Sequence, residues 1–213
     1  MEDAPDGEIT NGTHISDLKE GDSVLCRTNA PLMKVYVDLL KDKKEAYILG
    51  KDIGDNMIKA IKHFDVDVIN QNMHSDGLFL QLYQDLFYTR DKIMRQAGID
   101  KITASNSDEI VKKYDMIQCI SILSDGINSV DVLINKIKSI FSDKDRKGIK
   151  LSTIHKAKGL TLDNVYVCCP SLIPSSRAVQ KWEIDQEHNL EYVCYTRARK
   201  KLSFMSEEGR KLS

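Results

Sequence analysis

The chain has 213 residues, 41% of them hydrophobic and 30% charged, and a formal net charge of −1, a composition typical of a folded globular protein rather than a disordered one. No apolar run approaches the ~18 residues that a membrane helix needs, and the acidic N-terminus lacks signal-peptide character, so we expect no membrane partner. The near-neutral charge excludes a global attraction to nucleic acid, and any anion-binding surface must therefore be local.

The five cysteines are odd in number, lie mostly inside apolar runs and include no C-x-x-C spacing. This pattern predicts neither a disulfide framework nor a zinc site. It favours a reducing, cytoplasmic location and no bound metal of the protein's own.

The N-terminal part of the sequence predicts a strand, a helix and a second strand. Residues 1–14 are rich in Gly, Asp, Glu and Thr and predict a loose lead-in. Residues 22–27 and 46–50 are short apolar runs that suit buried strands, and residues 30–44 carry apolar side chains at helical spacing between them. A strand, helix and strand of these lengths form a βαβ unit, which favours a parallel sheet.

The middle of the chain differs from both ends. Residues 55–142 have helical periodicity throughout, and strand signals return at 148–153 and 164–169. A helix over 185–201 and a strand over 202–205 complete the pattern. The predicted fold is α/β, a parallel sheet flanked by helices and interrupted by an all-helical insertion.

The sequence lacks a phosphate-binding loop. Nucleoside triphosphatases carry G-x-x-x-x-G-K-[ST], in which backbone amides and the lysine contact the phosphates. The Gly50-Lys51 pair is followed by Asp52, and Glu45 stands where the first glycine should be. We therefore expect no complete site for ATP hydrolysis in this chain alone.

The segment CRTNAP places polar side chains directly after the first predicted strand. Arg27 offers a planar fork for phosphate, and Asn29 offers an amide for phosphate, sugar or base. Ligands of open α/β sheets gather at the carboxyl ends of the strands. Alternatively, Thr28 or Asn29 only caps the helix that follows.

The segment LSTIHKAKGL has the same arrangement after the strand at 148–153. A hydroxyl, an imidazole and an ammonium group, those of Thr153, His155 and Lys156, can all bind a phosphodiester. Gly159 lets the backbone approach a ligand closely. The alternative is a solvated turn with a satisfied histidine.

The segment NLEYVCYTRARKKL contains Arg197, which stands near the apolar stripe of the predicted helix. A cation near the core needs a partner, either a carboxylate or a ligand phosphate. Residues 199–201, another basic run, are instead predicted to form a solvated helix end that complements the helix dipole.

Together, in this order, VLCRTNAP, LSTIHKAKGL with DNVYV, and EHNLEYVCYTRARKKL resemble motifs IV, V and VI of the UvrD/Rep-type DNA helicases. AYILGKDIG resembles a segment of the phage-type members. Such helicases have two RecA-like domains, with ATP and Mg²⁺ in the cleft between them and single-stranded DNA across the top. The resemblance implies that residues 15–54 and 143–213 form the second RecA-like domain, and that residues 55–142 are a reduced 2B-like insertion.

The resemblance also implies roles for individual residues. Arg197 falls on the arginine finger of motif VI, which reaches the γ-phosphate, a role suited to a delocalised cation. Arg27, Asn29 and His155 fall on positions that contact the DNA strand, and Thr153 and Lys156 are their neighbours. We expect all three motifs to meet at the same rim of the sheet.

Motif V departs from the family at a nucleotide contact. Thr161, next to Gly159 in the expected nucleotide-binding loop, replaces a glutamate that contacts the nucleotide sugar. A second departure is Ser175 or Ser176, which stands where several relatives have a histidine near the DNA.

Three functional hypotheses follow. The first is the C-terminal motor domain of an ATP-dependent DNA helicase in repair or replication. It would be a cytoplasmic monomer in a bacterium or a phage-infected host, inactive without an N-terminal RecA-like ATPase domain. The second is a non-catalytic DNA-binding or partner-docking module on a helicase fold. The third is an interaction protein whose active part is the helical insertion.

Overall fold

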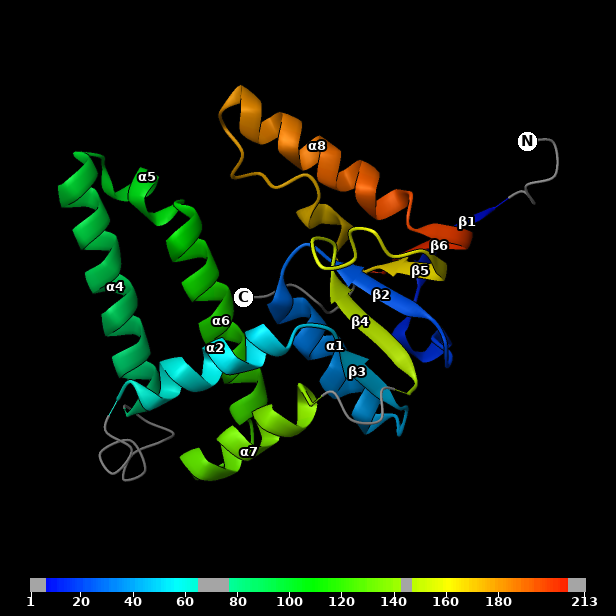
Figure 1. Cartoon of the computed structure of the whole chain (residues 1–213), viewed down its shortest axis with the longest axis horizontal. Helices are drawn as coiled ribbons and strands as arrows, with labels where there is room; N and C mark the ends of the chain where they lie inside the picture. The colour runs from blue at the N-terminus through cyan, green and yellow to red at the C-terminus, as the bar shows by residue number, and fades with distance from the viewer. Residues whose placement is uncertain (1–6, 65–76, 143–146, 207–213) are drawn as a thin grey trace. The chain divides into compact units, whose positions relative to one another are not determined.

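The computed structural model describes residues 7–64, 77–142 and 147–206. The chain forms two compact units, one of Met1–Gly50 with Asp143–Ser213 and one of Lys51–Ser142. The first unit holds the sheet and the second is helical (Figure 1). The fold class predicted from the sequence is confirmed.

The sheet of the first unit has six strands in the order β1-β6-β5-β2-β4-β3, and all neighbouring strands are parallel. Its strands are β1 (Glu8–Thr13), β2 (Ser23–Cys26), β3 (Ala46–Ile48), β4 (Ile149–Thr153), β5 (Leu162–Val167) and β6 (Ala198–Met205). The two central strands that flank the polar loops, β2 and β4, are almost wholly buried, as expected where both faces of a parallel sheet are covered.

Two long helices cover the sheet. They are α1 (Asn29–Lys41) and α8 (Lys181–Tyr195), and the short 3-10 helices η1 (Ile15–Asp17) and η2 (Pro170–Leu172) lie in the connections. The chain passes from β2 through α1 to β3 in one direction along the sheet, and from β5 through α8 to β6 in the other. Because such crossovers are right-handed, α1 and α8 cover opposite faces (Figure 1). The direction of winding therefore reverses between β2 and β5.

The core beneath α8 is apolar and continuous. Leu190 and Cys194 of α8 pack in one buried cluster with Leu25 of β2 and with Ile154 and Ala157, which follow β4. The turn after β4 therefore lies on the same face of the sheet as α8, anchored by its two apolar side chains.

The structure corrects the sequence prediction at both ends of the sheet. Residues 8–13 form strand β1 and pair with β6, whereas a loose lead-in was predicted over 1–14, of which residues 1–6 lie outside the described part. The sequence EITNGT shows no apolar alternation because β1 is an edge strand with little burial. Its hydroxyls instead contact Ser203, with Thr10 Oγ1 donating at 2.8 Å.

The prediction of one helix over 185–201 is wrong at its end. Helix α8 ends at Tyr195, and β6 begins at Ala198 and pairs with both β5 and β1. Two ladders outweigh the local helix propensity of Ala, Arg and Lys. The basic run 199–201 therefore lies in a strand, where Arg199 and Lys200 pair with Asp163 and Lys201 pairs with Glu8.

The second unit is built from five described helices: α2 (Lys51–Lys62), α4 (Leu78–Ala97), α5 (Lys101–Ser105), α6 (Asp108–Ser124) and α7 (Val130–Ile140). Gly54 allows α2 to approach the chain beyond α7, since a Cβ there would lie 2.8 Å from the ring of Phe141. Lys113 joins α6 to α4 by donating to Asp85 at 2.6 Å and to Thr89 at 2.7 Å. Among the described helices, none has the length and apolar character needed to cross a bilayer.

Candidate functional site

A buried carboxylate organises the loop that follows β2. Glu187 of α8 is 8% exposed. Nε of Arg27 donates to both of its oxygens at 3.1 Å, and Nη2 donates to Oε1 at 2.6 Å. Arg27, directly after β2, is thus held by a forked contact from a helix on the face of the sheet.

The same carboxylate binds the loop that leads into α8. The backbone N–H of Ser175 donates to Oε2 of Glu187 at 2.9 Å. Burial by itself would raise the pKa of Glu187, but the bonds from Arg27 and Ser175, with a contribution from the nearby charge of His155, hold it below its ordinary value. Glu187 is therefore ionised at neutral pH.

The position of this cluster follows from the topology. Arg27 follows β2 and Ser175 lies in the connection after β5, and these adjacent strands mark the point where the winding reverses. His155 comes two residues after the end of β4, on the other side of β2. Ligands of open α/β sheets bind at such a switch point, outside the carboxyl ends of the strands.

The turn after β4 presents its polar side chains to solvent. Thr153 is buried and its Oγ1 accepts a long hydrogen bond of 3.4 Å from the N–H of Lys156. The side chains of His155, Lys156 and Lys158 are exposed. Gly159 adopts φ +86° with open space around it, and this left-handed conformation favours glycine.

Asn29 occupies the first position of α1 and is half-buried. Thr28 is the N-cap residue, but its side chain makes no capping hydrogen bond. The simple capping role considered for Thr28 is therefore not what the structure shows.

Arg197 lies away from the Arg27–Glu187 pair. It follows α8 and directly precedes β6, and its carbonyl accepts from the N–H of Leu162 at 2.9 Å. Its guanidinium donates to the carbonyls of Val193 and Leu160 at 3.0 Å each, and to Thr196 Oγ1 at 3.1 Å. The guanidinium carries five N–H groups, so two remain beyond these three bonds.

The expectation that all three motifs meet at one rim is wrong. Arg27 and His155 lie at the carboxyl ends of β2 and β4, whereas Arg197 lies where β5 and β6 begin. Glu187, the partner of Arg27, lies about 12 Å before the end of α8 at Tyr195, at the helical rise of ~1.5 Å per residue. The residues expected to bind nucleotide do come together, because Thr161 is flanked by Leu160 and Leu162, which both contact Arg197.

The segment 154–161 joins the two places. It follows β4, the strand that pairs with β2, and it reaches Arg197 at the carbonyl of Leu160. This short stretch of chain thus links the polar residues at the carboxyl edge of the sheet to those at the amino ends of β5 and β6.

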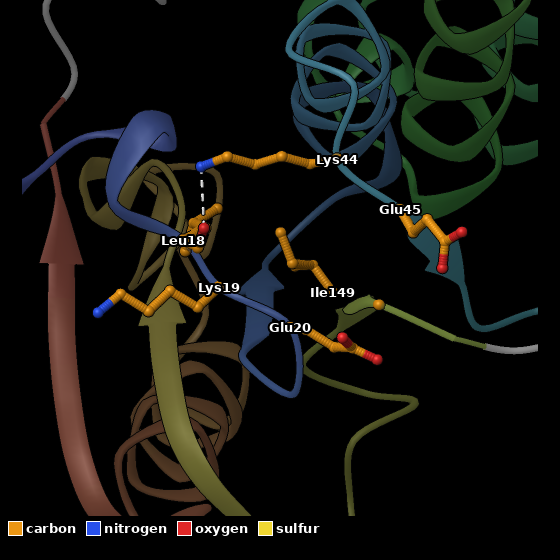
Figure 2. A pocket seen from close by; sticks show the side chains of 7 residues that line it. Leu18, Lys19, Glu20, Lys44, Glu45 and Ile149 are labelled. Carbon is orange, nitrogen blue, oxygen red and sulfur yellow. Dashed lines mark hydrogen bonds between the residues drawn. The ribbon is translucent and has the colours of Figure 1, made fainter.

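A pocket of about 310 Å³ lies at the amino ends of β2, β3 and β4 and contains none of the predicted site residues (Figure 2). Lys44 at its border donates to the carbonyls of Leu18 at 2.9 Å, Ile15 at 3.4 Å and Ser16. Its ammonium group therefore holds the end of η1. Within the described residues, no three His, Cys, Asp or Glu side chains are arranged to hold a metal ion.

Residues 22–209 match the family described as the UvrD-like helicase C-terminal domain. The chain belongs to this family. The match includes all three loops described above. The UvrD/Rep resemblance inferred from the sequence motifs is confirmed.

Two curated relatives of this UvrD-like domain are named ATP-dependent DNA helicase Rep. One, from Buchnera aphidicola subsp. Schizaphis graminum, is 34% identical over 205 residues, which cover 89% of this chain and 30% of the relative. The other, from Buchnera aphidicola subsp. Acyrthosiphon pisum, is 34% identical over 192 residues, covering 80% and 28%. The chain thus spans about 30% of the length of the curated relatives it matches.

One residue that contacts the predicted site, Glu187, was missed by the sequence interpretation. Glu187 gave no local signal, because its partner Arg27 is 160 positions away. Its place on the buried stripe of α8, one turn before Leu190, was the one available indication.

Proposed function

We propose that this chain is the C-terminal motor domain of an ATP-dependent DNA helicase, and that the carboxyl edge of its sheet contacts single-stranded DNA. The contacts come from Arg27, Asn29, Thr153, His155 and Lys156. The observation that carries the proposal is that Glu187 binds Arg27 at the switch point of the sheet, where the loop after the neighbouring strand β4 exposes His155 and Lys156.

In this proposal Arg197 takes part in ATP hydrolysis. The chain has no phosphate loop, so that ATP, the substrate, and its Mg²⁺ are bound mainly by an N-terminal RecA-like domain. Arg197, with Gly159 and Thr161 beside it, completes that site and neutralises charge that develops on the transferred phosphoryl group. Two N–H groups of its guanidinium remain beyond the three bonds to the protein.

The DNA-binding loops and the region around Arg197 act together. ATP binding draws the RecA-like domains together, and their closure and reopening move the DNA-binding loops along the strand, which gives translocation and strand separation. The segment 154–161 supports this coupling because it contacts Arg197 at one end and carries His155 at the other. The helicase acts as a cytoplasmic monomer, and residues 55–142 take the place of the 2B subdomain.

The DNA contacts are tested by titrating end-labelled oligothymidylate with the 213-residue chain at increasing salt. We expect weak binding that fades as salt rises, because phosphate contacts release counterions. Lys156→Ala should reduce the slope of log affinity against log salt by about 0.7, the value for one phosphate contact on a single strand.

Lys200→Ala is the matched control, since Lys200 is also an exposed lysine and pairs with Asp163 near the beginning of β5. It should leave the slope unchanged. Binding that persists unaltered above ~200 mM salt would contradict the proposed phosphate contacts.

A further inference from the structure

We propose that Glu187 is a positioning residue of the single-stranded DNA site, and that it orients the guanidinium of Arg27 for a strand phosphate. The inference rests on the proposed function, in which Arg27 contacts the strand. It adds a residue whose own charge opposes DNA binding and whose effect is exerted through Arg27.

The contacts of Glu187 link separate parts of the fold. The Glu187 carboxylate accepts from Nε and Nη2 of Arg27 and from the backbone of Ser175. It therefore joins the end of β2 to α8 and to the loop that leads into α8. Nη1 of Arg27 makes no hydrogen bond to any residue in the described ranges, and both its N–H groups are available to a phosphate.

The contact with Glu187 restricts the conformational freedom of the Arg27 side chain. An arginine on a free loop loses several rotamers when it binds a phosphate, which weakens the affinity. Here the fork to Glu187 already fixes the plane of the guanidinium, while 27% of the Arg27 side chain stays exposed. The Arg27 side chain is therefore already ordered in the folded protein, and DNA binding does not carry the entropic cost of ordering it.

The negative charge of Glu187 is unfavourable for binding DNA. A carboxylate beside a phosphate-binding loop repels DNA, and burial of an ion is costly unless it is fully paired. Glu187 is nevertheless buried and ionised, and its hydrogen bonds within the described residues come from Arg27 and Ser175. Electrostatics alone therefore predict that neutralising Glu187 strengthens DNA binding, whereas positioning predicts that it weakens binding.

The two expected changes in DNA affinity have opposite signs, so a single substitution distinguishes them. Glu187→Gln in the 213-residue chain should weaken binding of end-labelled oligothymidylate by about three- to tenfold at low salt, the range for one side chain that must be ordered on binding. Unchanged or tighter binding would overturn the inference. Glu191→Gln is the control, since it removes the same charge one turn later on α8, where Glu191 accepts from Tyr195 instead of Arg27.

A double-mutant cycle separates this inference from the proposed function. Arg27→Ala should weaken binding, and Glu187→Gln should cause no further weakening in that background, because its positioning action passes through Arg27. If Arg27→Ala leaves binding unchanged, the proposed contact of Arg27 fails and the inference falls with it. If Arg27→Ala weakens binding and Glu187→Gln does not, the inference alone is overturned.

Arg27→Lys tests the positioning role of Glu187 even if the Glu187→Gln variant does not fold. Lysine keeps the positive charge but cannot make the two-nitrogen contact that fixes a guanidinium plane. We expect binding about three- to tenfold weaker than that of the unmodified chain. Affinity equal to that of the unmodified chain would show that fixed orientation contributes nothing and would overturn the inference.

Discussion

Replacing Arg197 by alanine in a helicase that joins this chain to a phosphate-loop domain is expected to lower ATP turnover by about 10³ or more. An arginine that neutralises charge in phosphoryl transfer has effects of this size, because the stabilisation exists only in the transition state. ATP binding itself should change far less. Steady-state turnover with saturating single-stranded DNA measures the effect. Activity within a fewfold of the unmodified enzyme would contradict the arginine-finger assignment.

Two controls accompany this variant. Arg199→Ala removes a cation two residues away that pairs with Asp163, and it should leave turnover nearly unchanged. Arg197 also donates to the carbonyls of Leu160 and Val193, so that the alanine variant loses structural bonds as well. Thermal unfolding of each variant separates a folded, inactive enzyme from an unfolded one.

Gly148→Ala is expected to be the most destabilising single-methyl change in the sheet unit. Gly148 precedes β4 with φ +89°, and a Cβ there would lie 2.0 Å from the carbonyl oxygen of Glu45. That oxygen accepts from Ile149 at 2.8 Å where β3 and β4 begin, so neither strand can yield without losing the bond. We expect a loss of at least about 3 kcal/mol and a Tm lower by about 10 °C in the 213-residue chain.

Gly21→Ala is the matched control for this change. Gly21 has φ +88°, its N–H donates to the carbonyl of Gly148 at 3.4 Å, and its missing Cβ would meet nothing within 4 Å. It therefore isolates the cost of a left-handed alanine, about 1 to 2 kcal/mol. Equal shifts in Tm for the two variants would show that the contact with Glu45 can relax.

Much of the fold could be predicted from the sequence because its central strands contain short apolar runs. These runs, in SVLC and IKLST, stand out against polar surroundings, and the helical spacing between the first two predicted strands favours a parallel crossover. The order of the three motifs then identified the family. These features depend on residues that are close together in the sequence, so they can be recognised from a single sequence.

The features that were missed depend on contacts between distant segments. Strand β1 is stabilised by pairing with β6 at the far end of the chain, so the polar sequence EITNGT gives no strand signal. The end of α8 was misplaced because β5 and β1 draw residues 198–205 into the sheet.

The arrangement of the site was predicted only in part. Each motif was found, but their separation into two places was not, because the path of residues 154–161 from one end of the strands to the other is set by packing. Ile154 and Ala157 are buried under α8, which fixes that path. The pair between Arg27 and Glu187 likewise depends on how α8 lies on β2.

The central claim is that this chain is one half of an ATP-driven motor. The most direct measurement is ATP turnover, with single-stranded DNA present, by the 213-residue chain alone, by a UvrD-like N-terminal phosphate-loop domain alone, and by the two joined in one polypeptide. We predict no turnover from the chain alone, little from the N-terminal domain, and DNA-stimulated turnover from the joined protein that is lost on Arg197→Ala. Turnover by the chain alone, or a joined protein no more active than its N-terminal domain, would contradict the account.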